Sequence, residues 1–280
     1  MRGLVLSCSD ATHRPQGNAA SVSVAARSGP TVLVVSNRKG GTGKTTTAVN
    51  LAAEFAAAGR RTLLIDLDTQ GHCALGLGVP PSPGRPTVHH VFQDNHIGLL
   101  DARYPTCCPG LDLVPANPDF QHGSAPDDDQ VLARALAHPE LVSCYDQVVI
   151  DSPPSLDHLL LNALAAAHWA VIPFMPHPLA GEGVRQLSKV FFKVAMRSNA
   201  NLRMMGVLPV MLDMRIRQHQ IVRGQVARQF GEDRVLGGIR NDIKLAESFA
   251  AGLPIRLYAP RSRGNEDYRE VFRVIDRRMQ

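Results

Sequence analysis

The feature that most constrains the fold is a short glycine-rich run, Lys39 to Thr46, which stands between an apolar stretch and a helical pattern. The apolar stretch, residues 31–36, predicts a buried strand, and the apolar residues after the glycines recur at helical spacing. Glycines let the backbone fold closely around an anion with successive N–H groups pointing inward, and a helix start adds its positive dipole end. This order of strand, glycine loop and helix therefore predicts a phosphate-binding loop.

The residue types of this loop suggest a role for each position. Lys44 supplies a cation for the β- and γ-phosphates of a nucleotide, and Thr45 supplies a hydroxyl for Mg²⁺. The usual Walker A pattern requires a glycine five positions before Gly43, where this chain has Arg38. The chain has instead a second lysine, Lys39, at the start of the loop. The residues expected to surround the phosphates are Gly40, Gly41, Thr42, Gly43, Lys44, Thr45 and Thr46.

The segments after the loop continue the alternation of helix and strand. Residues 45–58 carry apolar side chains at helical spacing, and Gly59 follows as a C-terminal stop. Residues 62–66 predict a fully buried parallel strand, because all but the first and last are apolar. Repeated strand and helix signals predict an α/β protein with a doubly wound, mostly parallel sheet and helices on both faces.

Carboxylates follow two of the predicted strands. Asp66 and Asp68 come at the end of one, and Asp151 ends the strand at 147–151. In a doubly wound sheet the ligand lies beyond the carboxyl ends of the strands, so these groups should meet the glycine loop at one nucleotide. Asp151 suits Mg²⁺, which takes few protein ligands and keeps several waters. A lone aspartate after a strand is also a common helix cap, but three beside a phosphate loop favour the ligand site.

The second lysine and the aspartates make the chain resemble the ParA/MinD group of deviant Walker A P-loop ATPases, and most closely the ParA-like (Soj-like) partitioning ATPases. The resemblance covers roughly residues 30–275 and includes the segment from Gly206 to Asp213. Thr42 and Thr69 stand where the family often has valine and proline. Residues 80–130 match the family only loosely.

The resemblance implies an ATPase with ATP and Mg²⁺ as cofactors. Lys44 would bind the nucleotide of its own subunit, Lys39 would reach the nucleotide of a partner subunit, and Asp68 would orient the attacking water. These three are the catalytic candidates. The adenine contacts would come from Met211 and Asp213. The metal would be held by Thr45, Asp66 and Asp151.

Charge is divided unevenly along the chain. Residues 1–180 hold 11 Lys and Arg against 15 Asp and Glu, a net charge of −4, whereas residues 181–280 hold 19 against 10, a net charge of +9. A basic region favours a polyanionic partner, because Lys and Arg release condensed counterions from phosphates. Two groups stand out, and either is also consistent with the solvated side of an ordinary helix. One is a predicted helical stripe of Arg185, Lys189, Lys193 and Arg197, and the other lies where the family places nonspecific DNA contacts, Arg215, Arg217, Arg240 and Lys244.

Composition argues against several other classes. No apolar run reaches the ~18 residues needed to span a bilayer. Five cysteines, an odd number without CxxC spacing, favour a reduced cytosolic compartment over a disulfide framework. The adjacent Cys107 and Cys108 suggest a metal-cluster protein or reductase related to the nitrogenase iron protein, but the residues around them do not match that family.

The composition of residues 1–30 predicts a disordered leader, with an organelle transit peptide or a wrongly chosen start codon as alternatives. Residues 31–280 are predicted to form one ATPase domain.

The resulting hypothesis is a cytoplasmic ParA-like ATPase, associated with the nucleoid when ATP is bound. ATP would close a homodimer, the dimer would bind duplex DNA of any sequence, and slow hydrolysis stimulated by a ParB-like or cargo-adaptor protein would release it. The sequence does not decide whether the cargo is a chromosome, a plasmid or a protein assembly. It also does not decide whether the polyanion is DNA or another one. The alternative is a MinD-like ATPase that cycles on membranes to regulate division or organelle placement. Against it, the apolar residues of 268–280 are expected to pack on the sheet, as in ParA-like proteins, rather than anchor a membrane.

Overall fold

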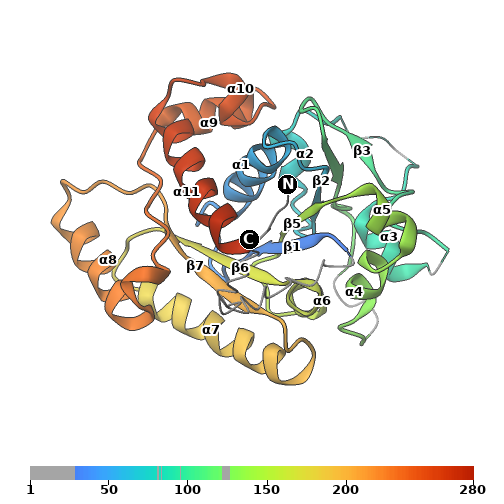
Figure 1. Cartoon of the computed structure of the whole chain (residues 1–280), viewed down its shortest axis with the longest axis horizontal. Coiled ribbons are helices and arrows are strands. Elements are labelled where there is room, and N and C mark those ends of the chain that lie inside the picture. The colour runs from blue at the N-terminus through green and yellow to red at the C-terminus, as the bar shows by residue number, and fades with distance from the viewer. Residues whose placement is uncertain (1–28, 81, 83, 95, 122–126) are drawn as a thin grey trace, which may run out of the picture.

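The computed structural model of the chain describes residues 29–80, 82, 84–94, 96–121 and 127–280, so the predicted leader lies almost wholly outside the described residues. Seven strands form one sheet in the order β3-β4-β2-β5-β1-β6-β7 (Figure 1). All neighbouring pairs are parallel except β3 with β4. The strands are β1 (Thr31–Val35), β2 (Thr62–Asp66), β3 (Tyr104–Pro105), β4 (Leu111–Val114), β5 (Gln147–Asp151), β6 (Trp169–Phe174) and β7 (Arg203–Pro209).

Helices cover both faces of this sheet. One face carries α1 (Lys44–Ala57), α2 (His72–Gly76), α9 (Ile243–Ala250), α10 (Ile255–Tyr258) and α11 (Arg263–Met279). The other carries α3 (Val88–Gln93), α4 (Val131–Leu136), α5 (Pro139–Cys144), α6 (His158–Ala166), α7 (Ala180–Arg197) and α8 (Arg217–Phe230), and a 3₁₀ turn, η2 (Glu232–Arg234), follows α8. The predicted doubly wound α/β fold is confirmed.

Two apolar cores lie on the two faces, because successive side chains of a strand point to opposite sides. In β1, Val32 and Val34 belong to one core and Leu33 and Val35 to the other, and all four are buried. Because β1 is covered on both faces, its sequence is a continuous apolar run without alternation of apolar and polar residues.

The predicted local signals are recovered in the elements around the loop. Helix α1 occupies nearly the predicted span, and Gly59 follows it with a φ of 86°, a conformation that favours glycine. Helix α7 exposes its basic stripe and buries Val184, Leu187 and Val194, as expected. Helix α11 buries Tyr268 among the residues of the core that α1 joins. Among the helices that the structure describes, none combines the length and apolar character needed to cross a membrane.

The position of β1 decides where a ligand can bind. The chain passes from β1 through α1 to β2 on one side of the sheet, and from β5 through α6 to β6 on the other. Strand order therefore reverses beside β1, and in open α/β sheets ligands bind outside the carboxyl ends of the strands at such a reversal. The glycine loop leaves β1 at this end.

Candidate nucleotide and metal site

The glycine loop is open to an approaching anion. Gly41 and Gly43 have φ of 71° and 72°, which favours glycine, and a Cβ at Gly40 or Gly41 would meet no atom within 4 Å. The loop is also held in shape. Asn37 donates from Nδ2 to the carbonyl of Pro173 on β6 at 2.7 Å, and its Oδ1 accepts the N–H of Lys39 at 3.0 Å. The backbone can therefore surround a phosphate without first being ordered.

The two lysines of the loop occupy different environments. Lys44, at the first position of α1, is 6% exposed, and its charge lowers the pKa of Asp151. Lys39 is exposed, although its carbonyl accepts a hydrogen bond from the Thr42 hydroxyl at 3.1 Å. One lysine of the loop is therefore buried, and the other is exposed to solvent.

Register brings the two buried aspartates side by side. Asp66 and Asp151 are aligned partners at the ends of β2 and β5, and both are fully buried. The two oxygens of Asp66 accept backbone N–H groups, Oδ1 from Asp68 at 3.1 Å and Oδ2 from Cys73 at 3.0 Å. Oδ1 of Asp151 has no hydrogen-bond partner among the described residues.

Burial raises the pKa of both carboxyl groups, because a charge loses its hydration inside the protein. For Asp66 the charge of Asp151 adds to this effect. Burial raises the pKa of Asp151 to about 7, against the lowering effects of a hydrogen bond from the Thr45 side chain and of the charge of Lys44. Two adjacent buried carboxylates and a hydroxyl are hard oxygen ligands whose charge a divalent cation would neutralise. Thr45, Asp66 and Asp151 therefore fit Mg²⁺.

Asp68 lies at the edge of this group. It is half-buried, its Oδ1 accepts the N–H of Gln70 at 3.2 Å, and its charge raises the pKa of both Asp66 and Asp151. These contacts place a carboxylate near the metal ligands without burying it completely. Its catalytic role stays a prediction.

A mostly apolar cavity of about 460 Å³ opens beside the loop. Its lining includes Gly43 and Thr46 from the loop region, Met211 after β7, and Phe249 on α9. Met211 has a φ of 52°, unusual for a residue with a side chain. Asp213 is absent from this lining, and its carboxylate is bound by Arg215. The predicted adenine contacts are thus divided, with Met211 at the cavity and Asp213 away from it.

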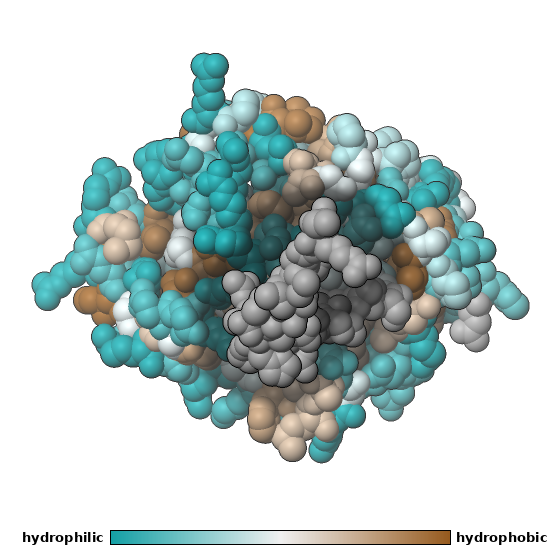
Figure 2. Space-filling view, in the orientation of Figure 1, coloured by the Kyte–Doolittle hydropathy of each residue, from teal (hydrophilic) through white to brown (hydrophobic). Residues whose placement is uncertain are grey.

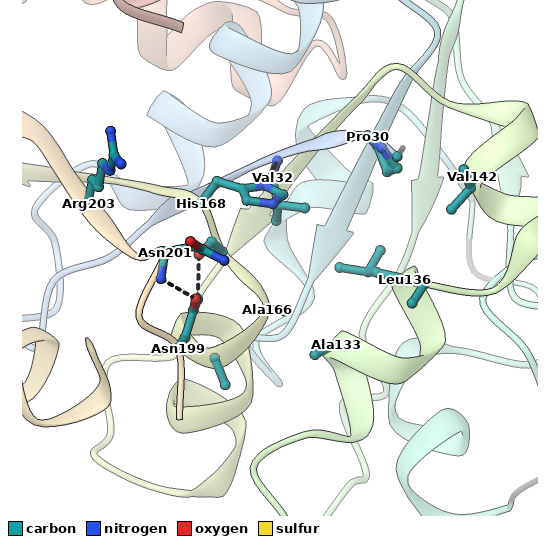
Figure 3. A pocket seen from close by; sticks show the side chains of 14 residues that line it. Pro30, Val32, Ala133, Leu136, Val142, Ala166, His168, Asn199, Asn201 and Arg203 are labelled. Atoms are coloured by element: carbon teal, nitrogen blue, oxygen red, sulfur yellow. Dashed lines mark hydrogen bonds between the residues drawn. The ribbon is translucent and has the colours of Figure 1, made fainter. Parts of the chain in front are cut away.

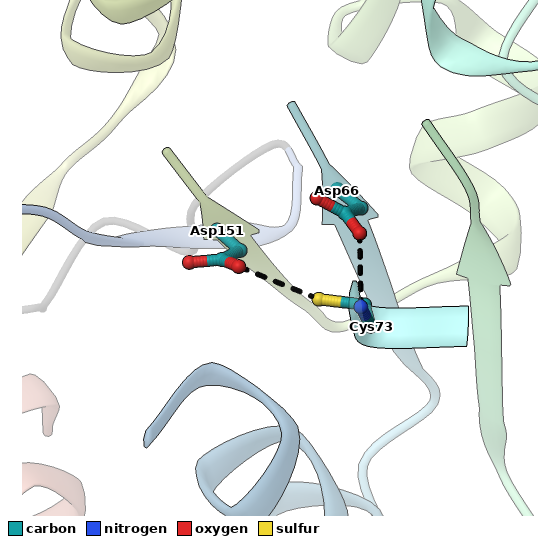
Figure 4. A group of neighbouring side chains, drawn as sticks. All are labelled: Asp66, Cys73 and Asp151. Carbon is teal, nitrogen blue, oxygen red and sulfur yellow. Dashed lines mark hydrogen bonds between the residues drawn. The ribbon is translucent and has the colours of Figure 1, made fainter. Parts of the chain in front are cut away.

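The structure also places Cys73 in the site, although nothing in the sequence distinguishes it from the other four cysteines. Its Sγ lies 3.6 Å from Oδ2 of Asp151, and burial raises the pKa of the thiol well above its usual value (Figure 4). Seven positions separate Cys73 from Asp66, and no spacing rule links the two. The turn through Gly71, whose φ is 66°, brings them together.

A larger cavity, of about 630 Å³, lies elsewhere (Figure 3). It is lined by Pro30 at the amino end of β1, by small residues such as Ala133 and Ala166, and by His168 and Arg203. This cavity therefore lies at the amino ends of the strands, whereas the glycine loop lies at their carboxyl ends. Neither the aspartates nor the loop lysines border it, so it is no part of this site.

Comparison with known proteins agrees with the geometry of the site. The profile of the AAA domain family matches residues 30–204. The chromosome-partitioning ATPase Soj of Thermus thermophilus is 39% identical over 254 residues, covering 89% of this chain and 96% of the relative. The chain belongs to the ParA-like P-loop ATPases.

Other relatives of this ParA-like ATPase are similar over comparable lengths. The chromosome partitioning protein ParA of Myxococcus xanthus is 37% identical over 255 residues, 88% of each protein. Among solved structures, a cobyrinic acid a,c-diamide synthase of Mycobacterium smegmatis with a bound ATP analogue and magnesium is 33% identical, with a TM-score of 0.75. The match covers 89% of this chain and 96% of that one. The predicted family is confirmed.

The DNA-contact candidates of this ParA-like ATPase differ in how free their charges are. Arg215 is bound by Asp213 at 2.7 Å, and the hydrogen bonds lower the pKa of that aspartate. Arg240 is held by Asp267 at 2.8 Å and by a second carboxylate on α11, and it lines the apolar cavity. Lys244 pairs with Glu247 one helical turn away. Arg217 makes no ion pair with any described residue.

Proposed function

We propose that this chain is a ParA-like partitioning ATPase that binds ATP with Mg²⁺ and hydrolyses it slowly to ADP and phosphate. The observation that carries the proposal is Oδ1 of Asp151, a fully buried carboxylate oxygen without a partner among the described residues. The Asp151 carboxyl group interacts with the Thr45 side chain and with the charge of Lys44, at the end of an open glycine loop. A metal ion with a nucleotide phosphate is the ligand that satisfies this group.

Each residue of the site has a task in this reaction. Lys44 and the loop N–H groups hold the phosphates, and Thr45 and the two buried aspartates hold the metal. Mg²⁺ held by these residues would supply positive charge that neutralises the negative charge developing during phosphoryl transfer. Asp68 orients the attacking water from the rim of the site. The solved Mycobacterium smegmatis structure, with its ATP analogue and magnesium, supports the choice of ligands.

The apolar cavity beside Gly43 is the place for the nucleotide base. Bases bury flat apolar faces, and the wall formed by Val210, Met211 and Phe249 offers such a surface at the loop. The polar rim at Asn241 can recognise the base edge. This assignment keeps Met211 as a base contact and leaves Asp213 to position Arg215.

A second subunit completes the site in the ATP-bound state. Lys39 is exposed at the loop, and Leu179 beside it in a small cavity is 70% exposed. Leu156, in the segment that follows Asp151, is 50% exposed. Apolar side chains flanking an exposed cation favour a protein surface as the cover, so ATP would close a homodimer across this face.

Duplex DNA is the proposed partner of the basic half. Helices α7 and α8 pack against each other, and their exposed cations include Lys189, Lys193 and Arg217 (Figure 1). Hydrophilic side chains dominate the described surface visible in Figure 2, with hydrophobic residues in small separate groups. Dimer closure would double this basic surface and convert two weak contacts into one avid contact. The protein would then reside in the cytoplasm, on the nucleoid when ATP is bound, until a ParB-like or cargo-adaptor protein stimulates hydrolysis.

A gel shift tests DNA binding. The wild-type protein with ATP and Mg²⁺ should shift two unrelated duplexes, and the affinity should fall steeply between two salt concentrations because counterions are released. Lys189→Glu/Lys193→Glu/Arg217→Glu should lose the shift and keep ATP binding. Arg240 is left intact because it borders the base cavity, so its reversal would confound the two readouts.

Arg134→Glu on α4, outside the basic half, is the matched control and should shift DNA like the wild type. Liposome pelleting runs in parallel. Pelleting with anionic liposomes and no DNA shift would reject DNA cycling in favour of the MinD-like alternative. Absence of ATP binding in the wild type would reject the whole proposal.

A further inference from the structure

A buried thiol lies between the two carboxylates of the metal site. In Figure 4 the Cys73 Sγ points toward Asp151 and lies 3.6 Å from its Oδ2, while the Cys73 backbone N–H donates to Oδ2 of Asp66. All three residues are fully buried, and one ligand atom from each lies within 4.8 Å of the other two. Magnesium prefers oxygen ligands, so a magnesium site does not need this sulfur.

The spacing suits a cation that accepts both sulfur and oxygen. In a tetrahedral zinc site, bonds of about 2.0 Å to oxygen and 2.3 Å to sulfur place the two ligand atoms about 3.5 Å apart. The Asp151 oxygen and the Cys73 sulfur are 3.6 Å apart before any metal binds. Affinity for mixed ligands also rises from magnesium to zinc, because thiolates select soft metals.

Two further observations indicate that the cluster is built to take a cation. Oδ1 of Asp151 is buried without a partner among the described residues, so the carboxylate has coordinating capacity left. Asp66 is oriented by two backbone N–H groups, from Asp68 and Cys73, which fix its carboxylate beside the thiol. The Cys73 sulfur and Oδ2 of Asp151 already lie at the spacing of a metal site, and a ligand atom of Asp66 lies within 4.8 Å of the ligand atoms of both.

We propose that Asp66, Cys73 and Asp151 form a site for a thiophilic divalent cation, Zn²⁺ or Cd²⁺, with water in the fourth position. On binding, the thiol releases its proton to solvent and a metal–thiolate bond forms, with no change in oxidation state. The cation occupies the carboxylates that Mg²⁺ requires, so it inhibits the magnesium-dependent reaction. Binding of the cation is inferred from the geometry alone, whereas inhibition of the magnesium-dependent reaction rests on the proposed function.

Cadmium provides the direct probe, because a cadmium–thiolate bond absorbs in the ultraviolet. The test protein is the full chain with Cys73 as its sole cysteine, and the matched control adds Cys73→Ser. Titration with Cd²⁺ in the absence of nucleotide should give a band that saturates at one ion per chain in the first and is absent in the second. No band with Cys73 alone, or equal bands in both, would overturn the proposal. The other cysteines are removed by Cys8→Ser, Cys107→Ser, Cys108→Ala and Cys144→Ser.

A second measurement uses the otherwise unaltered chain, in case the cysteine-depleted protein does not fold. Zn²⁺ affinity is measured by competition with a chromogenic chelator for the wild type and for Cys73→Ser. Loss of a residue that only hydrogen-bonds a metal ligand already lowers metal affinity about 10–100-fold. Loss of Cys73, a direct ligand, should therefore lower the Zn²⁺ affinity at least about tenfold. Equal affinities would overturn the site. ATP binding is measured separately, and its absence would refute the proposed function while leaving the cadmium result intact.

Discussion

Replacing Asp151 by asparagine should stabilise the nucleotide-free protein while weakening its binding of Mg²⁺. Burial raises the pKa of Asp151 from 3.8 to about 7. A raised pKa means that the folded structure disfavours the charged form of the carboxyl group. Asparagine has nearly the same shape and carries no charge, so it removes the unfavourable buried charge together with a proposed metal ligand.

The size of the pKa shift sets the size of the expected gain in stability. A pKa difference of about 3, at about 1.4 kcal/mol for each pKa unit, gives an upper bound near 4 kcal/mol for the gain above pH 7. The new amide must be buried where Oδ1 has no partner. An unsatisfied buried polar group costs about 1–3 kcal/mol, so a net gain of about 1–3 kcal/mol is expected at pH 8.

The pH dependence follows from the direction of the shift. Between about pH 4 and pH 7 the folded wild type keeps a proton that the unfolded chain has already lost, so this group lowers stability as the pH rises through that window. The Asp151→Asn variant lacks this decline. Urea unfolding without nucleotide at pH 5 and pH 8 measures both free energies. The advantage of the variant should be small at pH 5 and largest at pH 8, and equal or lower stability at pH 8 would refute the reasoning.

Asp146→Asn is the matched control with the opposite sign. Its carboxylate forms an ion pair with Arg61 at 2.6 Å, and the hydrogen bond from that arginine lowers the pKa of Asp146. Its favourable contribution is present above about pH 4 and is lost as the pH falls through the lowered pKa. Because the pair is well exposed, removing the charge should cost no more than about 1 kcal/mol at pH 8.

The remaining predictions concern the nucleotide cycle. Lys44→Ala should abolish ATP binding in calorimetry, because it removes the buried cation of the loop, and unchanged affinity would contradict the phosphate assignment. Lys39→Ala should keep ADP binding and lose the ATP-dependent dimer in light scattering, since its side chain is exposed, and a persistent dimer would reject its role in the partner's site. Asp68→Ala should lower turnover by a factor of about 10² or more and trap the ATP-bound dimer. Hydrolysis at the wild-type rate would assign the water-orienting role to another group.

Several features could be predicted from the sequence because they depend on local spacing. The glycine loop, helix α1 and its stop at Gly59 follow from residues that are neighbours in the chain. The two faces of α7 follow from helical periodicity in the same way. Covered parallel strands such as β2 appear as apolar runs ending in carboxylates, which predicted the edge of the sheet where the ligand binds.

Other features were decided by the tertiary structure, because they depend on which distant residues become neighbours. The alignment of Asp66 with Asp151 requires β2 and β5 to pair in one register, and that pairing creates the shared burial that raises their pKa values. Charge counts could not show that Arg240 is bound by Asp267, 27 positions away. The place of Cys73 depends on the turn before α2, and no pattern of residue types records it. Local periodicity thus determined the elements and the loop, whereas pairing across the sheet determined the charge, solvation and ligand set of the site.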